Sequence, residues 1–422
     1  MKQKVIIIGG GAMGLFSAYH LLKAGYQVMV LDEGSIPGVH SCSSGNAGMI
    51  VPSHFTPLST PEMVKEGLHN LLKSGSPFGI RWSGDPDLLS FLWKFFISSR
   101  SGDLKERSAM LANFHLESRQ IYLDVQENGG IDLHMEPSGL LMVCKKEKSL
   151  DRERRAADKA LHFGVPAELW SAEKYREHNQ HLNPQIAGAV LYPMDGKVDP
   201  FPMLKSLSCW LASNGADLVE QAPVTGVEVH EHRIEAVISN GQRYPADHFL
   251  VTAGIASREL AIKLGTRIPM QPGRGVSVSF KNDMPSLSHP TLLQDAHVAI
   301  TPYPHYTRLS GGFLLGEHSR YLSLKRLNAM VRSVREHYPD WNFRKPEIQK
   351  IWSGFRPVTP DGLPLIGKIP QLENGFLNTG HAMMGISLAP VSGKLITQWI
   401  GGLQDMNDPA TRYLDPARWI TG

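Results

Sequence analysis

The feature that most constrains this chain is a glycine motif near its start, in the stretch MKQKVIIIGGGAMGLFSAYHLLKAGYQVMVLDE. The β-branched, continuously apolar run Val5–Ile8 predicts a buried parallel strand. Apolar residues recur at helical spacing through Ala12–Lys23, and Gly25 ends that helix. Gln27–Leu31 predicts a second strand. The chain therefore opens as a strand–helix–strand unit, and the turn before the helix contains Gly9, Gly11 and Gly14.

This spacing, G-x-G-x-x-G, predicts a dinucleotide-binding turn. Gly9 permits the tight turn, Gly11 lets the backbone approach a pyrophosphate, and Gly14 lets the helix pack on the strand. The helix N-terminus favours phosphate. An acid at the end of the second strand accepts hydrogen bonds from ribose and would repel a 2′-phosphate, so FAD and NAD remain open and NADP is disfavoured. The predicted contacts are Gly9, Gly11, Ala12, Met13, Gly14, Asp32 and Glu33.

Further glycine-rich segments lie later in the chain. Ser41–His54 reads SCSSGNAGMIVPSH, a loop that can return to the pyrophosphate or simply lie on the surface. His248–Ser257 predicts a strand that runs through Ala253 and Gly254 into a helix. The stretch NTGHAMMGISLAPVSGKLITQWIGG predicts a glycine turn and then a long apolar helix from about Ile386. The N-terminus of that helix would be a second anion site.

Composition limits the class of protein. A chain of 422 residues predicts two or three domains, and a net charge of +3 is too weak to indicate nucleic-acid binding. The cysteines Cys42, Cys144 and Cys209 form no C-x-x-C pair, which favours a reducing compartment and no zinc site. The His230–His232 stretch, His-Glu-His, is interpreted as a turn between paired strands over Val224–Ile238, and no metal is expected.

The N-terminus lacks the features of a signal peptide, and no apolar run is long enough to span a membrane. We therefore expect a cytoplasmic protein without a transmembrane segment. The densely apolar run Leu88–Ile97 (LLSFLWKFFI) has three interpretations: a core helix, a wall of the substrate pocket, or a patch on a membrane surface. Burial in the core is favoured, because apolar helices are mostly buried.

Five segments in order carry a family resemblance: IIIGGGAMG with VLDE, SSGNAGMIVPSH, PMDGKVDP, WSGFRPVTPDGLPLIG and NTGHAMMG. With these, the chain resembles the FAD-dependent D-amino-acid oxidase/dehydrogenase-like family, the bacterial D-amino-acid dehydrogenases being the nearest subgroup. The resemblance implies a mixed α/β (α+β) fold, in which a Rossmann-type FAD-binding domain is interleaved with an antiparallel-sheet substrate domain. We expect the FAD-binding domain over residues 1–55, 150–235 and 345–422, and the substrate domain over 56–149 and 236–344.

The implied cofactor is non-covalent FAD, because the C-terminal half has no cysteine where relatives tether their flavin. The resemblance places the ADP moiety on the first glycine motif and Asp32, with Val224 on the adenine side. The pyrophosphate and ribityl chain would meet Ser43, Ser44, Asn46, Ala47, Gly48 and Met49. Further contacts to the ribityl chain and ring are expected from Ala253, Gly254, Gly354, Gly380, His381, Met384, Gly385 and Ile386.

The implied reaction is oxidation of a D-amino acid by hydride transfer from Cα to the flavin, giving an imino acid that water hydrolyses to a 2-oxo acid and ammonia. Arg356 is the expected carboxylate clamp, because a guanidinium can hold a carboxylate through two hydrogen bonds; a structural salt bridge is the alternative. His54, Tyr303 and Tyr321 are candidates to orient the amine or carboxylate. No strong base is needed if the amine binds neutral.

Several alternatives stay open. The same clamp would serve glycine, sarcosine or a cyclic imino acid such as D-proline or hydroxy-D-proline. A non-catalytic FAD-binding subunit is a remote alternative, against which the clamp at Arg356 argues. The sequence does not distinguish an oxidase from a dehydrogenase. If the electron acceptor is a membrane quinone, the protein lies peripherally at the inner face of the membrane and Leu88–Ile97, with Lys94, Arg100, Lys105 and Arg107 nearby, would make the contact.

Overall fold

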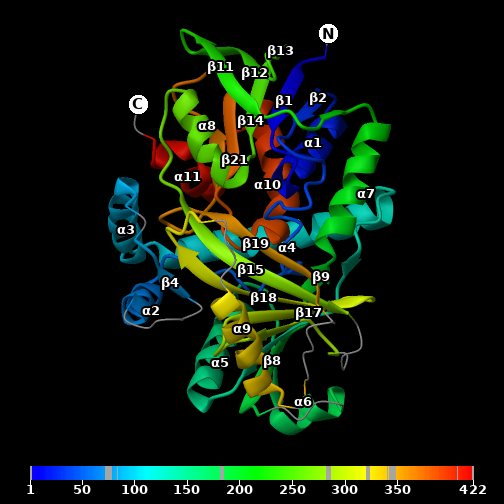
Figure 1. Ribbon diagram of the computed structural model, residues 1–422, viewed down its shortest axis with the longest axis vertical. Helices are drawn as coiled ribbons and strands as arrows, with labels where there is room; N and C mark the ends of the chain where they lie inside the picture. Colours follow the sequence, from blue (N-terminus) through cyan, green and yellow to red (C-terminus); the bar gives the residue numbers. More distant parts are fainter. Residues whose placement is uncertain are drawn as a thin grey trace.

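The computed structural model of the chain describes residues 2–71, 78–82, 84–180, 185–281, 287–319, 324–339, 341, 348–405 and 407–420. Two lobes are stacked along the long axis, each built around one large sheet (Figure 1). The first lobe, at the top of Figure 1, contains a six-stranded sheet and both chain termini. The second lobe, below it, contains a nine-stranded sheet.

The sheet of the first lobe is almost entirely parallel. Its strand order is β10 (Asp217–Val219), β2 (Gln27–Leu31), β1 (Lys4–Ile8), β14 (His248–Val251), β21 (Gly375–Thr379) and β20 (Leu365–Lys368), and β20 alone pairs antiparallel within this sheet. The central strand β1 is continuously apolar and buried, as strands covered on both faces are.

Helices cover this sheet. They are α1 (Ala12–Lys23), α7 (Pro200–Ser213), α8 (Ser257–Lys263), α10 (Gly385–Ile400) and α11 (Pro409–Leu414), with short 3₁₀ turns η1 (Gly254–Ala256) and η3 (Pro416–Arg418). Helices α1 and α10 approach closely, since a Cβ at Gly393 would lie 2.7 Å from the backbone of Phe16. A three-stranded meander, β11 (Val224–His230), β12 (Arg233–Ser239) and β13 (Gln242–Pro245), stands at the top of Figure 1.

The sheet of the second lobe is mostly antiparallel. Its order is β19 (Ile348–Val358), β15 (Gln271–Lys281), β18 (Tyr306–Leu315), β17 (Val298–Pro302), β16 (Thr291–Leu293), β6 (Leu140–Cys144), β8 (Gly188–Tyr192) and β7 (Glu168–Ser171), with β4 (Phe78–Ile80) paired to β18. The pairs β16–β6 and β18–β4 are parallel. A small sheet of β3 (Met49–Ile50), β9 (Gly196–Val198) and β5 (Met135–Glu136) lies beside it in the chain's core.

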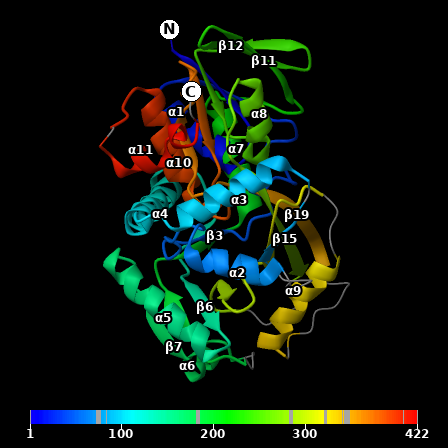
Figure 2. The same ribbon diagram turned by 90° about the vertical axis from the view of Figure 1, so that its left-hand side faces the viewer.

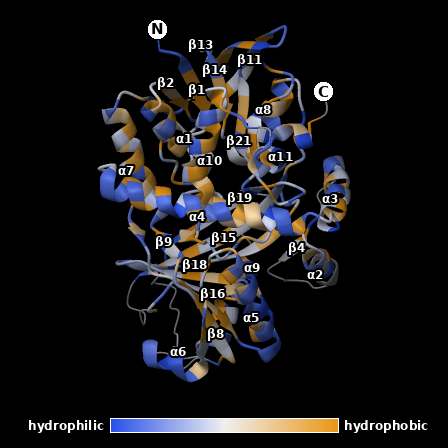
Figure 3. Cartoon of the chain, turned by 180° about the vertical axis from the view of Figure 1, so that it is seen from behind, coloured by the Kyte–Doolittle hydropathy of each residue, from blue (hydrophilic) through white to orange (hydrophobic). Residues whose placement is uncertain are grey.

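The second lobe carries α2 (Pro61–Leu71), α3 (Pro86–Ser99), α5 (Glu147–His162), α6 (Ala172–His178) and α9 (Leu324–His337), and the long α4 (Leu104–Asn128) crosses between the lobes (Figure 1). On α4, the Tyr122 hydroxyl donates to the Ile386 carbonyl oxygen at 2.7 Å, which ties α4 to α10. Figure 3 shows hydrophobic colouring on the interior strands and hydrophilic colouring on the outer helices α5 and α6. The two lobes therefore share a packed junction.

The expected fold class is confirmed, but sheet membership corrects the expected division into domains. Strands β7 and β8, expected in the FAD-binding part, belong to the nine-stranded sheet, and so does β19. Strand β14, expected in the substrate part, lies between β1 and β21 in the six-stranded sheet. The reason is physical: an apolar run shows that a strand is buried, whereas its sheet is decided by its pairing partners, which for β14 lie more than a hundred residues away in the sequence.

Two local predictions have contrasting outcomes. The turn interpretation of His230–His232 is confirmed, because these residues join β11 to β12. Among the described residues there is no group of three His, Cys, Asp or Glu side chains that could hold a metal ion. Burial of Leu88–Ile97 is only half right. In α3, Leu88 and Phe91 are buried, whereas Leu89, Trp93 and Ile97 face outward. Among the described residues, no helix has both the length and the apolar character needed to cross a membrane.

Candidate cofactor and substrate site

The first glycine motif forms a tight loop against β14. Gly9 has φ +114°, and a Cβ there would lie 2.8 Å from the Thr252 carbonyl oxygen. A Cβ at Gly14 would lie 1.9 Å from the Gly9 carbonyl oxygen, so the helix can pack on the loop only with glycine. The Thr252 hydroxyl donates to the Gly9 carbonyl at 2.8 Å. Gly11 is the N-cap of α1, and the first turn holds Ala12 and Met13.

Asp32 lies beside this loop at the end of β2, half-buried. Its Oδ2 accepts from the Gly10 N–H at 2.7 Å, and its Oδ1 accepts from the Gly34 N–H at 2.8 Å. Each carboxylate oxygen retains a further lone pair that can accept a hydrogen bond from a hydroxyl group. Glu33 is exposed. The carbonyl oxygen of Asp32 accepts from the N–H of Ala222 at 2.7 Å, so the segment that leads to Val224 passes beside the acid.

The loop of residues 43–49 joins this cradle. The Ser43 hydroxyl accepts from the Ala12 N–H at 3.0 Å, at the first turn of α1. Ser44 differs from expectation: it is buried, and its hydroxyl donates to the Gly38 carbonyl at 2.6 Å, so its hydroxyl stabilises the loop. The Asn46 Oδ1 accepts from the Gly48 N–H at 2.8 Å. Met49 then starts β3.

Side chains of the second lobe hold this loop from below. The Tyr303 hydroxyl lies 2.9 Å from the Ala47 carbonyl oxygen and 3.0 Å from that of Val198. Gly48 has φ +76°, and a Cβ there would lie 2.2 Å from the Tyr303 hydroxyl. Arg308 donates to the Asn46 carbonyl at 2.6 Å. The buried Tyr303 therefore positions the loop, which corrects the expectation that it orients substrate.

Of the two tyrosines predicted at the site, Tyr321 lies outside the described residues. The middle segment of the chain lies beside the first glycine loop. Ala253 and Gly254 are half-exposed beside the first glycine loop, and a Cβ at Gly9 would lie 2.9 Å from the Ala253 Cα. The Thr379 hydroxyl donates to the Gly254 carbonyl at 3.1 Å, which links this segment to β21.

The C-terminal glycine turn lies at the start of α10. Gly380 has φ +82°, and a Cβ there would lie 2.8 Å from the Thr359 Cγ2. His381 is buried, its Nε2 lies 2.9 Å from the Ser392 Oγ, and burial lowers its pKa to about 3. Its Nδ1 has no hydrogen-bond partner in the described part of the chain. Met384 is the N-cap of α10, Gly385 is half-exposed, and Ile386 is buried.

Arg356 lies on β19, next to this turn. The Ala382 N–H donates to the carbonyl of Pro357 at 2.9 Å, which joins the strand to the turn. The guanidinium lies against Gly275, where a Cβ would be 2.3 Å from the Arg356 Cζ, and it donates to the Gly312 carbonyl at 2.7 Å. Burial lowers the pKa of the guanidinium. Among the described residues, no carboxylate lies within ion-pair distance of it.

Two contacts that sequence reasoning missed fasten β19 to the cofactor loop. The Cys42 thiol lies 2.8 Å from the Phe355 carbonyl oxygen, and burial raises the pKa of this thiol to about 11, so it remains protonated. The indole of Trp352 donates to the carbonyl of His40 at 3.1 Å. A Cβ at Gly354 would lie 2.1 Å from this indole, so Gly354 makes room for Trp352. No sequence signal could reveal these contacts, because the partners lie more than 300 residues apart.

His54 belongs to a hydrogen-bonded chain that the sequence does not show. Its Nδ1 lies 2.9 Å from the Ser53 Oγ, which lies 2.6 Å from Oδ2 of Asp195. The Ser53 N–H donates to Oδ1 of Asp195 at 3.0 Å. Asp195 is 0% exposed, and burial raises its pKa to about 7, whereas burial lowers the pKa of His54 to about 4. In the sequence, Asp195 is part of the segment PMDGKVDP, and its partners there are not apparent.

This chain lies close to the start of α10. The Ser387 hydroxyl, in the first turn of that helix, accepts from the Val51 N–H at 2.9 Å. Nδ1 of His115, on α4, lies 2.9 Å from the same hydroxyl. The segment that carries His54 is therefore fixed to the helix that follows the C-terminal glycine turn.

Comparison with known proteins is consistent with this geometry. Residues 4–399 match the family described as DAO, FAD dependent oxidoreductase, so the chain belongs to this family of flavin enzymes. It is 28% identical over 399 residues to the D-amino acid dehydrogenase of Helicobacter pylori, across 94% of each chain. It is also 28% identical over 423 residues to that of Rhizobium johnstonii, across 97% of this chain and 100% of the relative.

Among solved structures, the chain is similar to the glycine oxidase of Geobacillus kaustophilus, with a TM-score of 0.75 and 21% identity over 98% of this chain and 99% of that one. The family resemblance and the FAD cofactor expected from the sequence are thus confirmed. The residues present fit this cofactor. The cradle leaves no room for a side chain at Gly9 or Gly14, and Asp32 stands beside it. The Nδ1 of His381, unpartnered among the described residues, adjoins the second helix N-terminus.

Proposed function

We propose that this flavoenzyme oxidises a D-amino acid to the 2-oxo acid and ammonia, with Arg356 as the carboxylate clamp. The names of the relatives support the reaction class, and one observation supports the clamp: a half-buried guanidinium, held against the nine-stranded sheet, that no described carboxylate neutralises. Removing such a cation from water costs free energy unless an anion pairs with it. Bound FAD would supply the acceptor for the hydride that leaves Cα.

The surroundings of Arg356 suit a small zwitterion. Gly275 leaves room for the guanidinium against the strand, and the Gly312 carbonyl oxygen accepts a hydrogen bond from one of its nitrogens. The remaining N–H groups can therefore donate to a carboxylate. A planar fork holds a carboxylate through two parallel hydrogen bonds, which fixes the direction of the Cα–H bond. Low local polarity strengthens this pairing relative to water.

The test uses the FAD-loaded enzyme mixed anaerobically with D-alanine, D-proline, hydroxy-D-proline, glycine and sarcosine, while flavin absorbance is followed. We expect rapid bleaching by a D-amino acid. Arg356→Lys keeps the charge but loses the fork, so the limiting rate constant of flavin reduction divided by the substrate dissociation constant should fall about 100-fold with unchanged FAD content. The exposed Arg243 supplies the matched control, Arg243→Lys.

The panel separates the alternatives. If only glycine or sarcosine bleaches the flavin, the substrate is an achiral amino acid rather than a D-amino acid. Absence of bleaching by every compound would refute the proposed reaction and favour a non-catalytic FAD-binding subunit. Normal reduction of the Arg356→Lys enzyme would refute the clamp while leaving the reaction standing.

We also propose that α3 binds an anionic membrane surface, where a quinone accepts the electrons. Leu89, Trp93 and Ile97 recur at helical spacing and are 60%, 63% and 52% exposed. Figure 2 shows α3 at the surface of the molecule. The exposed Arg100 and Lys105 beside this stripe complement anionic lipid.

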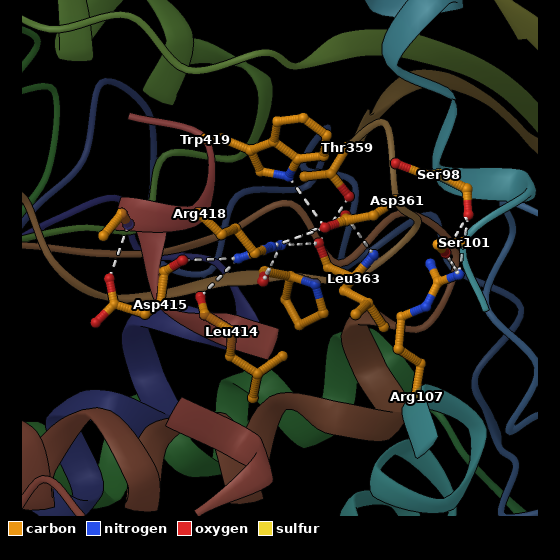
Figure 4. Close-up of polar contacts among 12 residues, drawn as sticks. Ser98, Ser101, Arg107, Thr359, Asp361, Leu363, Leu414, Asp415, Arg418 and Trp419 are labelled. Atoms are coloured by element: carbon orange, nitrogen blue, oxygen red, sulfur yellow. Dashed lines mark hydrogen bonds and ion pairs between the residues drawn. The ribbon is translucent and has the colours of Figure 1, made fainter. Parts of the chain in front are cut away.

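Arg107 does not belong to this basic group. It is buried, pairs with Asp103 at 2.9 Å, and donates to the Ser98 carbonyl at 2.9 Å and the Ser101 hydroxyl (Figure 4). Its role is to hold the end of α3 against α4. This corrects the sequence-based grouping of Arg107 with the exposed cations.

The test is sedimentation of the holoenzyme with vesicles of phosphatidylserine and phosphatidylcholine at low salt, with pure phosphatidylcholine for comparison. We expect binding to the anionic vesicles only, lost in Trp93→Glu. Leu161→Glu, at an exposed leucine of α5, is the matched control and should still bind. Equal loss in both variants, or no sedimentation of the unmodified enzyme, would refute the contact. Anaerobic reoxidation of the reduced enzyme by a short-chain ubiquinone tests the acceptor separately.

A further inference from the structure

We propose that His54, Ser53 and Asp195 form a chain that accepts the proton of the substrate ammonium group, with Asp195 as the final acceptor. This inference rests on the proposed amino-acid oxidation. Free amino acids carry a protonated amine at neutral pH. The nitrogen lone pair must be free before the C–N double bond of the imino acid can form, so the site needs a proton acceptor.

The direction of the hydrogen bonds supports the chain. When Asp195 is ionised it can only accept, and it receives both the N–H and the O–H of Ser53. Because the serine has only one hydroxyl proton, the 2.9 Å contact with His54 requires the histidine Nδ1–H to donate to the serine oxygen. The Nε2 of His54 then carries a lone pair and can accept a proton.

The segment that carries His54 runs between the two parts of the site. At one end, the Val51 N–H is bound by Ser387 in the first turn of α10. At the other end, a Cβ at Gly362 would lie 2.6 Å from the Leu58 nitrogen, so the segment touches the loop that follows the Arg356 strand. His54 is half-exposed as a residue, whereas Asp195 is fully buried, so the chain leads from a partly accessible histidine into the interior.

The proton transfer balances without a further reactant. The ammonium proton moves to Nε2 of His54, the Nδ1 proton moves to the Ser53 oxygen, and the serine proton moves to Oδ2 of Asp195. The substrate amine becomes neutral and Asp195 becomes a carboxylic acid, while both intermediate groups end neutral. After the transfer, the Asp195 O–H can donate to the Ser53 oxygen, and the Ser53 O–H can donate to Nδ1 of His54, so every hydrogen bond of the chain is retained.

The electrostatic environment suits a reversible acceptor. Burial is the main cause that raises the Asp195 pKa, Glu153 on α5 raises it further, and Arg119 on α4 opposes both. Tyr192 on β8 also adjoins Asp195, and its own hydroxyl donates to Glu153 at 2.8 Å. The titratable group that faces His54 from α4 is His115, which burial keeps neutral.

The experiment compares the FAD-loaded wild type with Asp195→Asn and Ser53→Ala. The limiting rate of flavin reduction by D-alanine is measured from about pH 5 to pH 9. We expect the wild-type rate to rise through an ionisation near neutral pH. Both variants should lose this step and be slower by about 100- to 10,000-fold, the usual contribution of a positioned proton acceptor. Ser53→Thr keeps a hydroxyl and should restore the step.

A second readout does not depend on turnover. Infrared titration of the resting holoenzyme should show a carboxylic-acid band that disappears as the pH rises through neutrality and is absent from Asp195→Asn. FAD content and melting temperature establish that the variants fold. Retention of the pH step in both variants, or absence of the infrared band, would overturn the proton chain. Failure of any amino acid to reduce the wild-type flavin would instead overturn the proposed reaction itself.

Discussion

Replacing Arg418 with alanine should destabilise the protein far more than loss of an exposed arginine does. Arg418, in η3 near the C-terminus, pairs with Asp361 in the loop after β19, with Nε 2.7 Å from Oδ2 (Figure 4). The same guanidinium donates to four backbone carbonyls at 2.8–3.1 Å, those of Leu363, Pro364, Leu414 and Asp415. One side chain therefore fixes the C-terminal turn to the loop that leads away from the Arg356 strand.

The magnitude follows from burial. The two side chains are only 14% and 9% exposed, and breaking a buried ion pair by removing one partner costs about 3–5 kcal/mol. Asp361 keeps the N–H groups of Trp419 and Leu363 as donors, which favours the lower end of that range. We therefore expect a loss of about 3 kcal/mol. At about 2 °C per kcal/mol for a chain of this size, the melting temperature should fall by about 6 °C.

The assay is thermal unfolding of the FAD-loaded protein followed by far-ultraviolet circular dichroism. Arg412→Ala is the matched control, because Arg412 pairs with Glu106 at 3.5 Å with both side chains mostly exposed, and such pairs contribute under about 1 kcal/mol. In Arg418→Ala with Asp361→Ala, the combined loss should be smaller than the sum of the single losses, because the buried carboxylate is gone. A shift for Arg418→Ala no larger than that of the control would refute the reasoning.

Three further substitutions test the site. Gly14→Ala places a Cβ 1.9 Å from a backbone oxygen of the cradle, so the protein should purify without yellow colour, whereas Gly102→Ala, with open space around it, should retain FAD. Gly275→Ala places a Cβ 2.3 Å from the Arg356 Cζ, so the KM for substrate should rise about 10-fold at unchanged FAD content; an unchanged KM would show that the guanidinium does not bind substrate. Because burial raises the pKa of Asp195 from 3.8 to about 7, its ionisation costs the folded state about 4 kcal/mol as the pH rises from 4 to 8. Asp195→Asn escapes this cost, so its urea stability relative to wild type should improve over that range; buried histidines, which favour the folded state as the pH rises, affect both proteins alike.

The cofactor cradle was predictable because its information is local. A buried strand, three glycines, a helix and an acid follow one another within 32 residues. Glycines between a strand and a helix indicate a tight turn or a close backbone approach that excludes side chains. The structure bears this out, since side chains at Gly9 and Gly14 would collide with neighbouring backbone. Asp32 also lies beside the loop as expected.

Roles that depend on distant partners were not predictable. The sequence presents Tyr303 as an aromatic residue near the site, but only the fold shows its hydroxyl bound to backbone oxygens at Ala47 and Val198. Asp195 belongs to the segment PMDGKVDP that carries part of the family resemblance, but its partner Ser53 stands 142 positions earlier. Pairing across such separations depends on the whole topology, which a run of residues does not encode by itself.

The indole of Trp352 has a consequence for how this sequence can drift over evolutionary time. A Cβ at Gly45 would lie 2.0 Å from the ring, and one at Gly354 would lie 2.1 Å from it. Neither glycine can therefore acquire a side chain while the tryptophan persists, and a smaller residue in its place would leave a void between the strand and the loop. Across related sequences, substitutions at Gly45, Trp352 and Gly354 should therefore occur together.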